Sequence, residues 1–406
     1  MTNLTIFKNA LLIDGTGADP LADAAVVVEG GRIKEVDPSG NARGSAARTI
    51  DLAGKTLMPG LMDAHVHPGN VELYLTETAK LPPAVYVHRV TRTLEMDLAL
   101  GFTTLRDAGG LDQGFREAVQ RGLINGPRLR LAVTPLTQSG AYPHGPPPAR
   151  NSLGVRPEVC DGPEEVRKSV RLTLGRGADH IKVFADGEVV AQSKSDRALP
   201  GQWKFSVQEL KMAAQTARAA GTYVMAHAYG PRAIQNCITA GIRTIEHGNL
   251  LDEETAELMA RHGVYYVPTL TVYDLLSAKC RDALDGPTLE KLEIVGRAGR
   301  HALELAYRAG VKIGSGSDII GPLQHLKGCE LVIKTEVMTP MEAIVSATRT
   351  NAELMGLAHR TGTIEPGKSA DLIVVNGNPL EKMALFEKSV ETVTHVMIDG
   401  QIRKQP

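Results

Sequence analysis

The sequence predicts an α/β fold: a (β/α)8 TIM barrel with a small β-sandwich domain that both termini build. Between residues 58 and 360, eight short apolar runs alternate with amphipathic segments, the pattern of parallel strands joined by helices. Short strand-like runs with glycine-rich breaks flank this region at both ends, and neither end is long enough to bury a core alone. We therefore expect residues 1-57 plus 361-406 to form the composite β-sandwich domain and residues 58-360 to form the barrel.

The elements follow from local patterning. The terminal strand-like runs are 4–12, 24–28, 32–36, 49–52, 371–375 and 393–398. The barrel strands are expected at 60–66, 103–106, 129–134, 180–184, 222–226, 244–246, 264–268 and 311–314. Ser206 and Glu209 form a capping box that begins a helix ending at Gly221, and Thr339 with Glu342 repeats that pattern before another helix.

Two loops are longer than a plain barrel needs. Residues 137–162 contain five prolines, and residues 186–206 contain the only tryptophan, Trp203. Because these loops follow the third and fourth strands, they belong to the C-terminal face, where barrel enzymes carry their chemistry. Loops of this length in a compact domain are usually functional, so we expect both to cover a substrate.

Composition narrows the possible partners. The 406 residues carry 45 basic and 46 acidic side chains, a net charge of -1, without a basic stripe. Nucleic acid and membrane surfaces are therefore not expected partners. The four cysteines are far apart, which argues against a disulfide framework. Neither a signal-peptide pattern nor an apolar run of ~20 residues is present, so a cytoplasmic location is expected.

A set of potential metal ligands recurs at the ends of the predicted strands. His65 and His67 lie two residues apart on the first strand, so both side chains point to one face. Lys182, His227, His247 and Asp318 follow on the fourth, fifth, sixth and eighth strands. Taken singly, a histidine can be a core residue and Asp318 can cap a helix. Six coincident positions instead favour a hydrolase with a metal centre, and nitrogen and oxygen ligands without thiolates suit Zn²⁺, with Mn²⁺ or Co²⁺ as alternatives.

Lys182 needs a separate explanation, because an ammonium group cannot bind a metal. Burial between apolar neighbours lowers the pKa of a lysine and frees its lone pair. Such an amine can take up CO₂ as a carbamate, whose two oxygens can bridge two metals. The alternative is a lysine that reaches solvent or binds a substrate carboxylate. The residues alone leave these two interpretations equal.

The chain resembles the amidohydrolase superfamily. The carrying motifs are the opening run Pro59 to His67, PGLMDAHVH, and the closing run Gly362 to Leu372, GTIEPGKSADL. The runs GFTTLRDAGG at 101–110, AHAY at 226–229, IEHGN at 245–249 and VPTL at 267–270 are similar to the prolidase-like branch, which is related to imidazolonepropionase-like hydrolases. That branch contains binuclear metallopeptidases that cleave dipeptides or N-acyl amino acids at the C-terminal residue.

The resemblance assigns roles to the predicted ligands. His65, His67 and Asp318 would hold one divalent metal, His227 and His247 a second, both expected to be zinc, and an N6-carboxylated Lys182 would bridge them. A hydroxide held between the metals would attack the amide, with Asp318 as general base. Tyr229 would bind the scissile carbonyl oxygen, its ordinary alternative being a ring packed at the barrel rim. Relatives of this kind commonly form homo-oligomers.

One departure affects the substrate. Relatives carry Gly-Gly-His after the third strand, whereas this chain reads SGAYPH at 139–144. Tyr142 or His144 can replace that histidine, or the leaving group differs. We expect an Xaa-Pro-type dipeptide or N-acyl amino acid as substrate, with an aryl amide, carbamate, urea or cyclic amide, including amide toxins or xenobiotics, as the alternative. A homologue without activity is a third hypothesis, which the complete ligand set disfavours.

Substrate binding is expected mainly from the two long loops. Candidates that would shape the pocket or bind a substrate carboxylate are Tyr142, His144, Trp203, Arg106, Arg150, Lys194 and Arg197. Arg106 also has a structural interpretation, because it can pair with the adjacent Asp107 at the barrel mouth.

Overall fold

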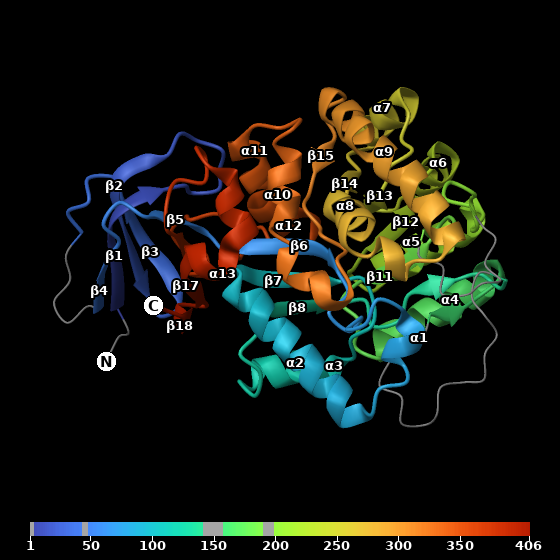
Figure 1. The fold of residues 1–406 in the computed structure, drawn as a ribbon, viewed down its shortest axis with the longest axis horizontal. Helices are drawn as coiled ribbons and strands as arrows, with labels where there is room; N and C mark the ends of the chain where they lie inside the picture. The colour runs from blue at the N-terminus through green and yellow to red at the C-terminus, as the bar shows by residue number, and fades with distance from the viewer. Residues whose placement is uncertain (1–3, 43–47, 141–156, 190–198) are drawn as a thin grey trace.

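The structure, a computed structural model, describes residues 4–42, 48–140, 157–189 and 199–406. Figure 1 shows two parts, a sheet built from the blue and red ends of the chain and a barrel surrounded by helices. The first and last described strands, β1 (Leu4–Leu12) and β18 (Gln401–Lys404), both belong to this sheet. No helix within the described ranges combines the length and the apolar character needed to cross a bilayer.

The terminal sheet has eight strands drawn from both ends of the chain. Its strands are β1 (Leu4–Leu12), β2 (Leu21–Glu29), β3 (Arg32–Asp37), β4 (Arg48–Asp51), β5 (Thr56–Pro59), β16 (Leu372–Val375), β17 (Val393–Ile398) and β18 (Gln401–Lys404). They run in the order β18-β17-β16-β5-β1-β2-β3, and β4 pairs with β1. An isolated antiparallel β-bridge pairs Arg32, on the edge strand β3, with Ser369, in the segment that precedes β16.

Strands from both ends of the chain share an apolar core at this sheet. Phe7, Val26 and Leu57 from the first strands pack with Leu372 and Met397 from the last ones. The shared core explains why neither terminus needs to fold alone. The structure forms a single eight-stranded sheet here. The two-sheet sandwich and the domain boundaries at residues 57 and 361 stay predictions.

The eight expected barrel strands are all present. They are β6 (Leu61–Val66), β7 (Phe102–Asp107), β8 (Arg128–Leu131), β11 (Ile181–Phe184), β12 (Val224–Ala228), β13 (Thr244–His247), β14 (Tyr265–Val267) and β15 (Lys312–Ile313). Every pairing among them is parallel. Two backbone hydrogen bonds join the resulting sheets into a ring, from Ala64 N to Ser315 O at 2.8 Å and from Asp179 N to Leu131 O at 2.7 Å.

Helices cover the barrel, as Figure 1 shows. They are α1 (Leu75–Thr78), α2 (Pro83–Ala99), α3 (Gln113–Gln120), α4 (Gly162–Gly175), α5 (Val207–Ala219), α6 (Pro231–Ala240), α7 (Glu253–His262), α8 (Leu270–Lys279), α9 (Gly286–Arg308), α10 (Cys329–Lys334), α11 (Pro340–Val345), α12 (Asn351–Leu354) and α13 (Ser389–Thr392). Short 3-10 segments lie at Arg281–Ala283, Gly321–Leu326 and Met383–Lys388, and a π-helical segment lies at Ser346–Thr350. Both predicted capping boxes are confirmed, at Ser206 before α5 and at Thr339 before α11.

The strand bounds differ from the expected ones by one to three residues, and two of these differences matter for the site. The third barrel strand ends at Leu131 rather than at Thr134, because Val133 has a φ of 58°, which extended backbone does not allow. The fifth strand extends to Ala228, so His227 lies inside the parallel pairing rather than beyond it.

The long loops begin with short ordered pieces. After β8, the pair β9 (Leu136–Thr137) and β10 (Glu158–Val159) extends the sheet beside β11. After β11, Asp186 forms an isolated bridge with Trp203. Because β9 and Asp186 follow strand ends, both loops begin at the C-terminal face of the barrel, as expected.

Candidate metal centre

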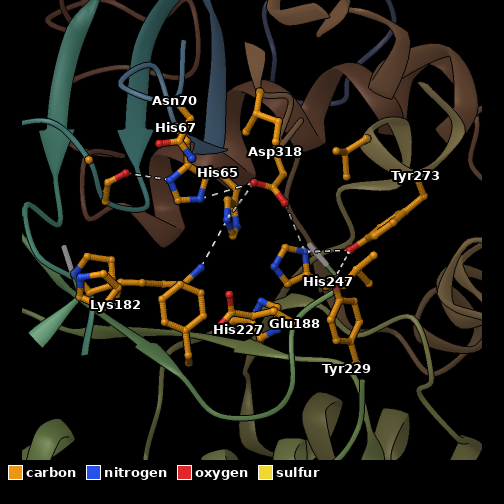
Figure 2. Close-up of a pocket in the computed structure, with 18 of the residues that line it drawn as sticks. His65, His67, Asn70, Lys182, Glu188, His227, Tyr229, His247, Tyr273 and Asp318 are labelled. Carbon is orange, nitrogen blue, oxygen red and sulfur yellow. Dashed lines mark hydrogen bonds and ion pairs between the residues drawn. The ribbon is translucent and has the colours of Figure 1, made fainter. Parts of the chain in front are cut away.

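All six predicted ligands line one cavity of about 120 Å³ at the C-terminal ends of the barrel strands. Figure 2 shows these side chains pointing toward one another from different strands. The lining residues are His65, His67, Asn70, Gly109, Gly110, Pro135, Pro157, Lys182, Phe184, Glu188, Val189, His227, Tyr229, His247, Val272, Tyr273, Leu276, Asp318 and Ile320. Ligands spread over five strands of the sequence are therefore brought to one place by barrel closure.

His65, His67 and Asp318 form the tightest ligand group. One donor atom from each lies within 4.8 Å of the other two. The Nε2 atoms of His65 and His67 lie 3.6 and 3.5 Å from Asp318 Oδ1. His67 Nδ1 donates to Gly109 O at 2.7 Å, which leaves the lone pair of Nε2 facing Asp318. This spacing suits a metal ion placed between the three side chains.

A buried ion pair orients His65. Its Nδ1 donates to Glu246 Oε2 at 2.9 Å, so Nε2 keeps the lone pair that faces the cavity. Arg106 binds both oxygens of the same carboxylate, at 2.8 and 3.0 Å, and donates to Ala64 O. Arg106 and Glu246 are both fully buried.

The candidate substrate role of Arg106 needs correction. Its guanidinium points into the barrel interior, pairs with Glu246 rather than with Asp107, and does not line the cavity. Its donors are taken by Glu246, Thr244 and Ala64. A substrate carboxylate in the cavity would therefore find no free donor on Arg106, which instead neutralises the buried Glu246.

His227 and His247 lie in edge-to-face contact in the lining of the cavity, with ring centroids 4.5 Å apart. His227 Nε2 lies 3.4 Å from both Gly187 O and Asp186 Oδ1, so Nε2 carries the proton and Nδ1 is free to bind a metal. His247 Nδ1 lies 2.8 Å from Thr269 Oγ1, a hydroxyl oxygen that can accept a proton from Nδ1 and leave Nε2 with its lone pair. Burial lowers the pKa of both imidazoles well below the usual value, which favours the neutral, metal-binding form.

Lys182 is fully buried in the middle of these ligands. Its Nζ lies 3.3 Å from His65 Nε2 and 5.2 Å from the centre of the Phe184 ring. Burial lowers the pKa of Lys182 to about 8, although Glu246 and Asp318 act in the opposite direction. A side chain of this kind has an appreciable fraction of neutral amine at neutral pH.

Asp318 sits on a constrained turn. It has a φ of 51°, and His247 has a φ of 74°, conformations that cost energy for residues other than glycine. The preceding Ser317 donates its N–H and its hydroxyl to the buried carboxylate of Asp63, at 3.0 and 2.5 Å, and Asp318 N donates to His65 O. These bonds fix the carboxylate of Asp318 beside the two histidines. Burial raises its pKa to about 7.

Tyr229 lies at the cavity wall next to His227 and His247. Its backbone N–H donates to Asp186 Oδ2 at 2.6 Å, and its hydroxyl accepts from Tyr273 at 3.0 Å. Burial raises the pKa of both tyrosines well above the usual value, so both hydroxyls keep their protons at neutral pH. Tyr229 therefore keeps a hydroxyl proton that it can donate, and this hydroxyl lies beside Tyr273 in the lining of the cavity.

The family of the chain follows from sequence comparison. The family model described as the amidohydrolase family matches residues 56–403. The chain belongs to the amidohydrolase family. The ochratoxinase of Aspergillus niger is 32% identical over 426 residues, which cover 99% of this chain and 87% of that protein.

Solved structures agree with the family assignment. The crystal structure of a prolidase complexed with N-methylphosphonate-L-proline has 36% identity and a TM-score of 0.93, with 100% of each chain covered. The structure of a Xaa-Pro dipeptidase with methionine bound in its active site has 30% identity and a TM-score of 0.88, covering 98% of this chain and 99% of that chain. The family and these relatives make this amidohydrolase a hydrolase of C–N bonds.

The donor set fits the divalent metals that are typical of this family. Neutral imidazole nitrogens and one carboxylate converge, and each histidine has its second nitrogen held by an oxygen acceptor, which is the arrangement found around protein-bound zinc. Within the described residues, Lys182 has no carboxylate within 4.0 Å to neutralise an ammonium. A carbamate on Lys182 would remove that positive charge and add two oxygen ligands.

The remaining substrate candidates divide into two groups. Tyr142, His144, Arg150, Lys194 and Arg197 lie outside the described residues. Trp203 is 50% exposed and does not line the cavity.

Three cavity or supporting residues of this amidohydrolase were not identified from the sequence: Glu188, Glu246 and Tyr273. A charged residue inside the apolar β13 strand was a usable signal for Glu246, because such residues are buried only when paired. Neither Glu188, in a loop, nor Tyr273, on a helix, gave a sequence signal, since their places in the cavity depend on the tertiary fold.

Proposed function

We propose that this amidohydrolase binds two divalent metal ions, most suitably Zn²⁺, and hydrolyses an amide bond to release a C-terminal amino acid from an Xaa-Pro-type dipeptide or an N-acyl amino acid. The observation that carries the proposal is the convergence of His65, His67 and Asp318 within 4.8 Å, in a cavity that Lys182, His227 and His247 also line. The prolidase and the Xaa-Pro dipeptidase among its structural relatives support the choice of substrate.

The ligands divide between two positions. His65, His67 and Asp318 would hold one ion, and His227 and His247 the other, with carboxylated Lys182 between them. Bound ions would lower the pKa of a water molecule from 15.7 to about 7 and would draw charge from the scissile carbonyl.

The protein's own side chains carry the proton and orient the substrate. Asp318, whose pKa burial raises to about 7, is suited to take the proton of the attacking water and to pass it to the leaving amine nitrogen. Tyr229 donates a hydrogen bond to the carbonyl oxygen, where negative charge develops. The apolar walls at Val189, Val272 and Leu276 exclude water around the acyl group.

A second substrate class has support from the cavity lining. Among the described lining residues, Lys182 is the only lysine and arginine is absent, so no other described cation is available to a free substrate carboxylate. For the part of the lining that the structure describes, this favours an aryl amide, carbamate, urea or cyclic amide, and the similarity to ochratoxinase supports the amide toxins within this class. The two proposals share the metal centre and differ in what the long loops recognise.

A hydrolysis screen separates these proposals. Metal-loaded protein is incubated with dipeptides, N-acyl amino acids, aryl amides and carbamates, and both products are quantified. Release of free amino acids from the first two sets supports the leading proposal, whereas preferential cleavage of the others supports the second. A fully metal-loaded protein that cleaves no C–N bond in the screen would contradict both.

A further inference from the structure

Tyr273 lies between a metal-ligand candidate and the substrate-binding tyrosine. It is on α8, is 4% exposed, and lines the cavity. Its hydroxyl lies 3.1 Å from His247 Nδ1 and 3.0 Å from the hydroxyl of Tyr229 (Figure 2). The residue therefore joins two groups for which the proposed function already has roles, although it has none itself.

The number of protons on His247, Tyr273 and Tyr229 decides which group donates to which in this series of hydrogen bonds. If Nε2 of His247 binds the proposed metal, the proton of this ring is on Nδ1, and the hydroxyl oxygens of Thr269 and Tyr273 are placed to accept it. The single proton of Tyr273 then bonds the oxygen of Tyr229, and the proton of Tyr229 remains for the cavity. If Tyr229 instead donated its proton to Tyr273, only oxygen lone pairs of Tyr229 would face the substrate. Those lone pairs would repel a carbonyl oxygen.

We propose that Tyr273 is a positioning residue that holds the hydroxyl proton of Tyr229 toward the scissile carbonyl oxygen, through the hydrogen-bond chain from His247 to Tyr273 to Tyr229. The inference rests on the proposed function, because it needs a carbonyl substrate at Tyr229. A hydroxyl that accepts a hydrogen bond is in turn a stronger donor. The hydrogen bond from Tyr273 therefore makes the Tyr229 hydroxyl a stronger donor to the carbonyl oxygen, where negative charge develops. Tyr273 thereby couples the electrostatics of a metal ligand to binding of the transition state.

The effect belongs to the chemical step. Charge on the carbonyl oxygen is larger in the transition state than in the bound substrate, so loss of the chain lowers kcat more than it changes KM. Because Tyr273 acts only through Tyr229, its contribution disappears once the hydroxyl of Tyr229 is removed.

A double-mutant cycle on the metal-loaded enzyme tests this. Tyr273→Phe is expected to lower kcat about two- to tenfold, the effect of one net hydrogen bond, with KM nearly unchanged. Tyr229→Phe lowers kcat further, and the double variant is no slower than Tyr229→Phe alone. Multiplicative losses in the double variant would overturn the proposal, as would a loss that appears only in KM.

A matched control distinguishes the loss of the proposed hydrogen bond from a general effect of removing a buried tyrosine hydroxyl. Tyr266 on β14 is also fully buried, and its hydroxyl has no hydrogen-bond partner among the described residues, so Tyr266→Phe should leave kcat unchanged. Metal content of every variant is measured alongside, and equal content shows that His247 still binds its ion.

The thermal unfolding midpoint is measured for the same set of variants, because this measurement does not depend on catalytic activity. The two tyrosine substitutions should be non-additive there too, because either one removes the same hydrogen bond. If the wild type cleaves no substrate, the proposed function fails by itself. Additive midpoint shifts would show that the chain from Tyr273 to Tyr229 does not exist, independently of that failure.

Discussion

His65 donates its Nδ1–H to Glu246 Oε2 at 2.9 Å, and both side chains are almost completely buried. Arg106 neutralises the carboxylate from its other side. This arrangement fixes the ring orientation of His65 and keeps Nε2 unprotonated toward Asp318. A buried carboxylate on the strand next to His227 thus orients one of the proposed metal ligands.

Replacement of Glu246 should weaken metal binding. Glu246→Gln keeps the shape but removes the charge that polarises His65 and pairs with Arg106. We expect metal affinity to fall roughly 10- to 100-fold, measured by competition with a chelator. Glu257→Gln on the exposed face of α7 is the control, and unchanged affinity in both variants would contradict the assigned role.

Metal stoichiometry and the role of Asp318 form a second prediction. The active protein should contain two divalent ions per chain and lose activity on chelation, because six ligands exceed the needs of one tetrahedral ion. Asp318→Asn should lower kcat by about 10²- to 10⁴-fold, since it removes the general base. Asp282→Asn at an exposed position should have no effect. Elemental analysis that finds one ion or none in active enzyme would reject the binuclear centre.

Carboxylation of Lys182 is a third prediction. Lys182→Ala should be inactive, and bicarbonate or a short carboxylic acid should partly restore activity by supplying the missing bridge. Lys334 is a matched buried lysine whose pKa burial also lowers to about 8, but its Nζ donates to Ser346 Oγ. Loss of activity in Lys334→Ala should therefore not be rescued. Intact-mass measurement of an unmodified Lys182 in fully metal-loaded, active protein would count against the carbamate.

Recognition of a substrate carboxylate is a fourth prediction. If the leading substrate class is right, converting the free acid of a good substrate to its amide should lower kcat/KM about ten- to a hundredfold, the loss of a charge-assisted hydrogen bond. Metal content should stay the same. Equal rates for acid and amide would reject the peptidase-like proposal in favour of the aryl amide, carbamate or urea class.

The pH dependence of stability is a fifth prediction, made for metal-free protein. Burial lowers the pKa of His67 from 6.5 to about 4, so the unfolded chain binds more protons than the folded one between these values. Stability from this residue is therefore fully present above pH 6.5 and is lost as pH falls through about 4, by about 3 kcal/mol. The unfolding free energy, measured with urea at several pH values in this range, should fall less steeply with decreasing pH for His67→Asn than for the wild type. The exposed His301→Asn should keep the wild-type slope, and equal slopes for all three proteins would refute the prediction.

The sequence by itself determined the barrel strands and the six side chains that meet at one cavity. Alternating apolar runs have a periodicity that backbone geometry imposes, so all eight strands were found, with errors of a few residues at their ends. His65 and His67 were identifiable because two residues on one strand share a face. Local chemistry also settled the capping boxes at Ser206 and Thr339.

Only the tertiary structure decided which side chains support that centre. Arg106 was a candidate for the substrate until closure of the barrel placed it against Glu246, a partner 140 residues away. Tyr273 gave no local signal, because its contact with Tyr229 depends on how α8 packs beside the cavity. Spacing along a strand is fixed by covalent geometry, whereas contacts between distant elements arise only when the whole core packs, and a single sequence carries no periodicity that records them.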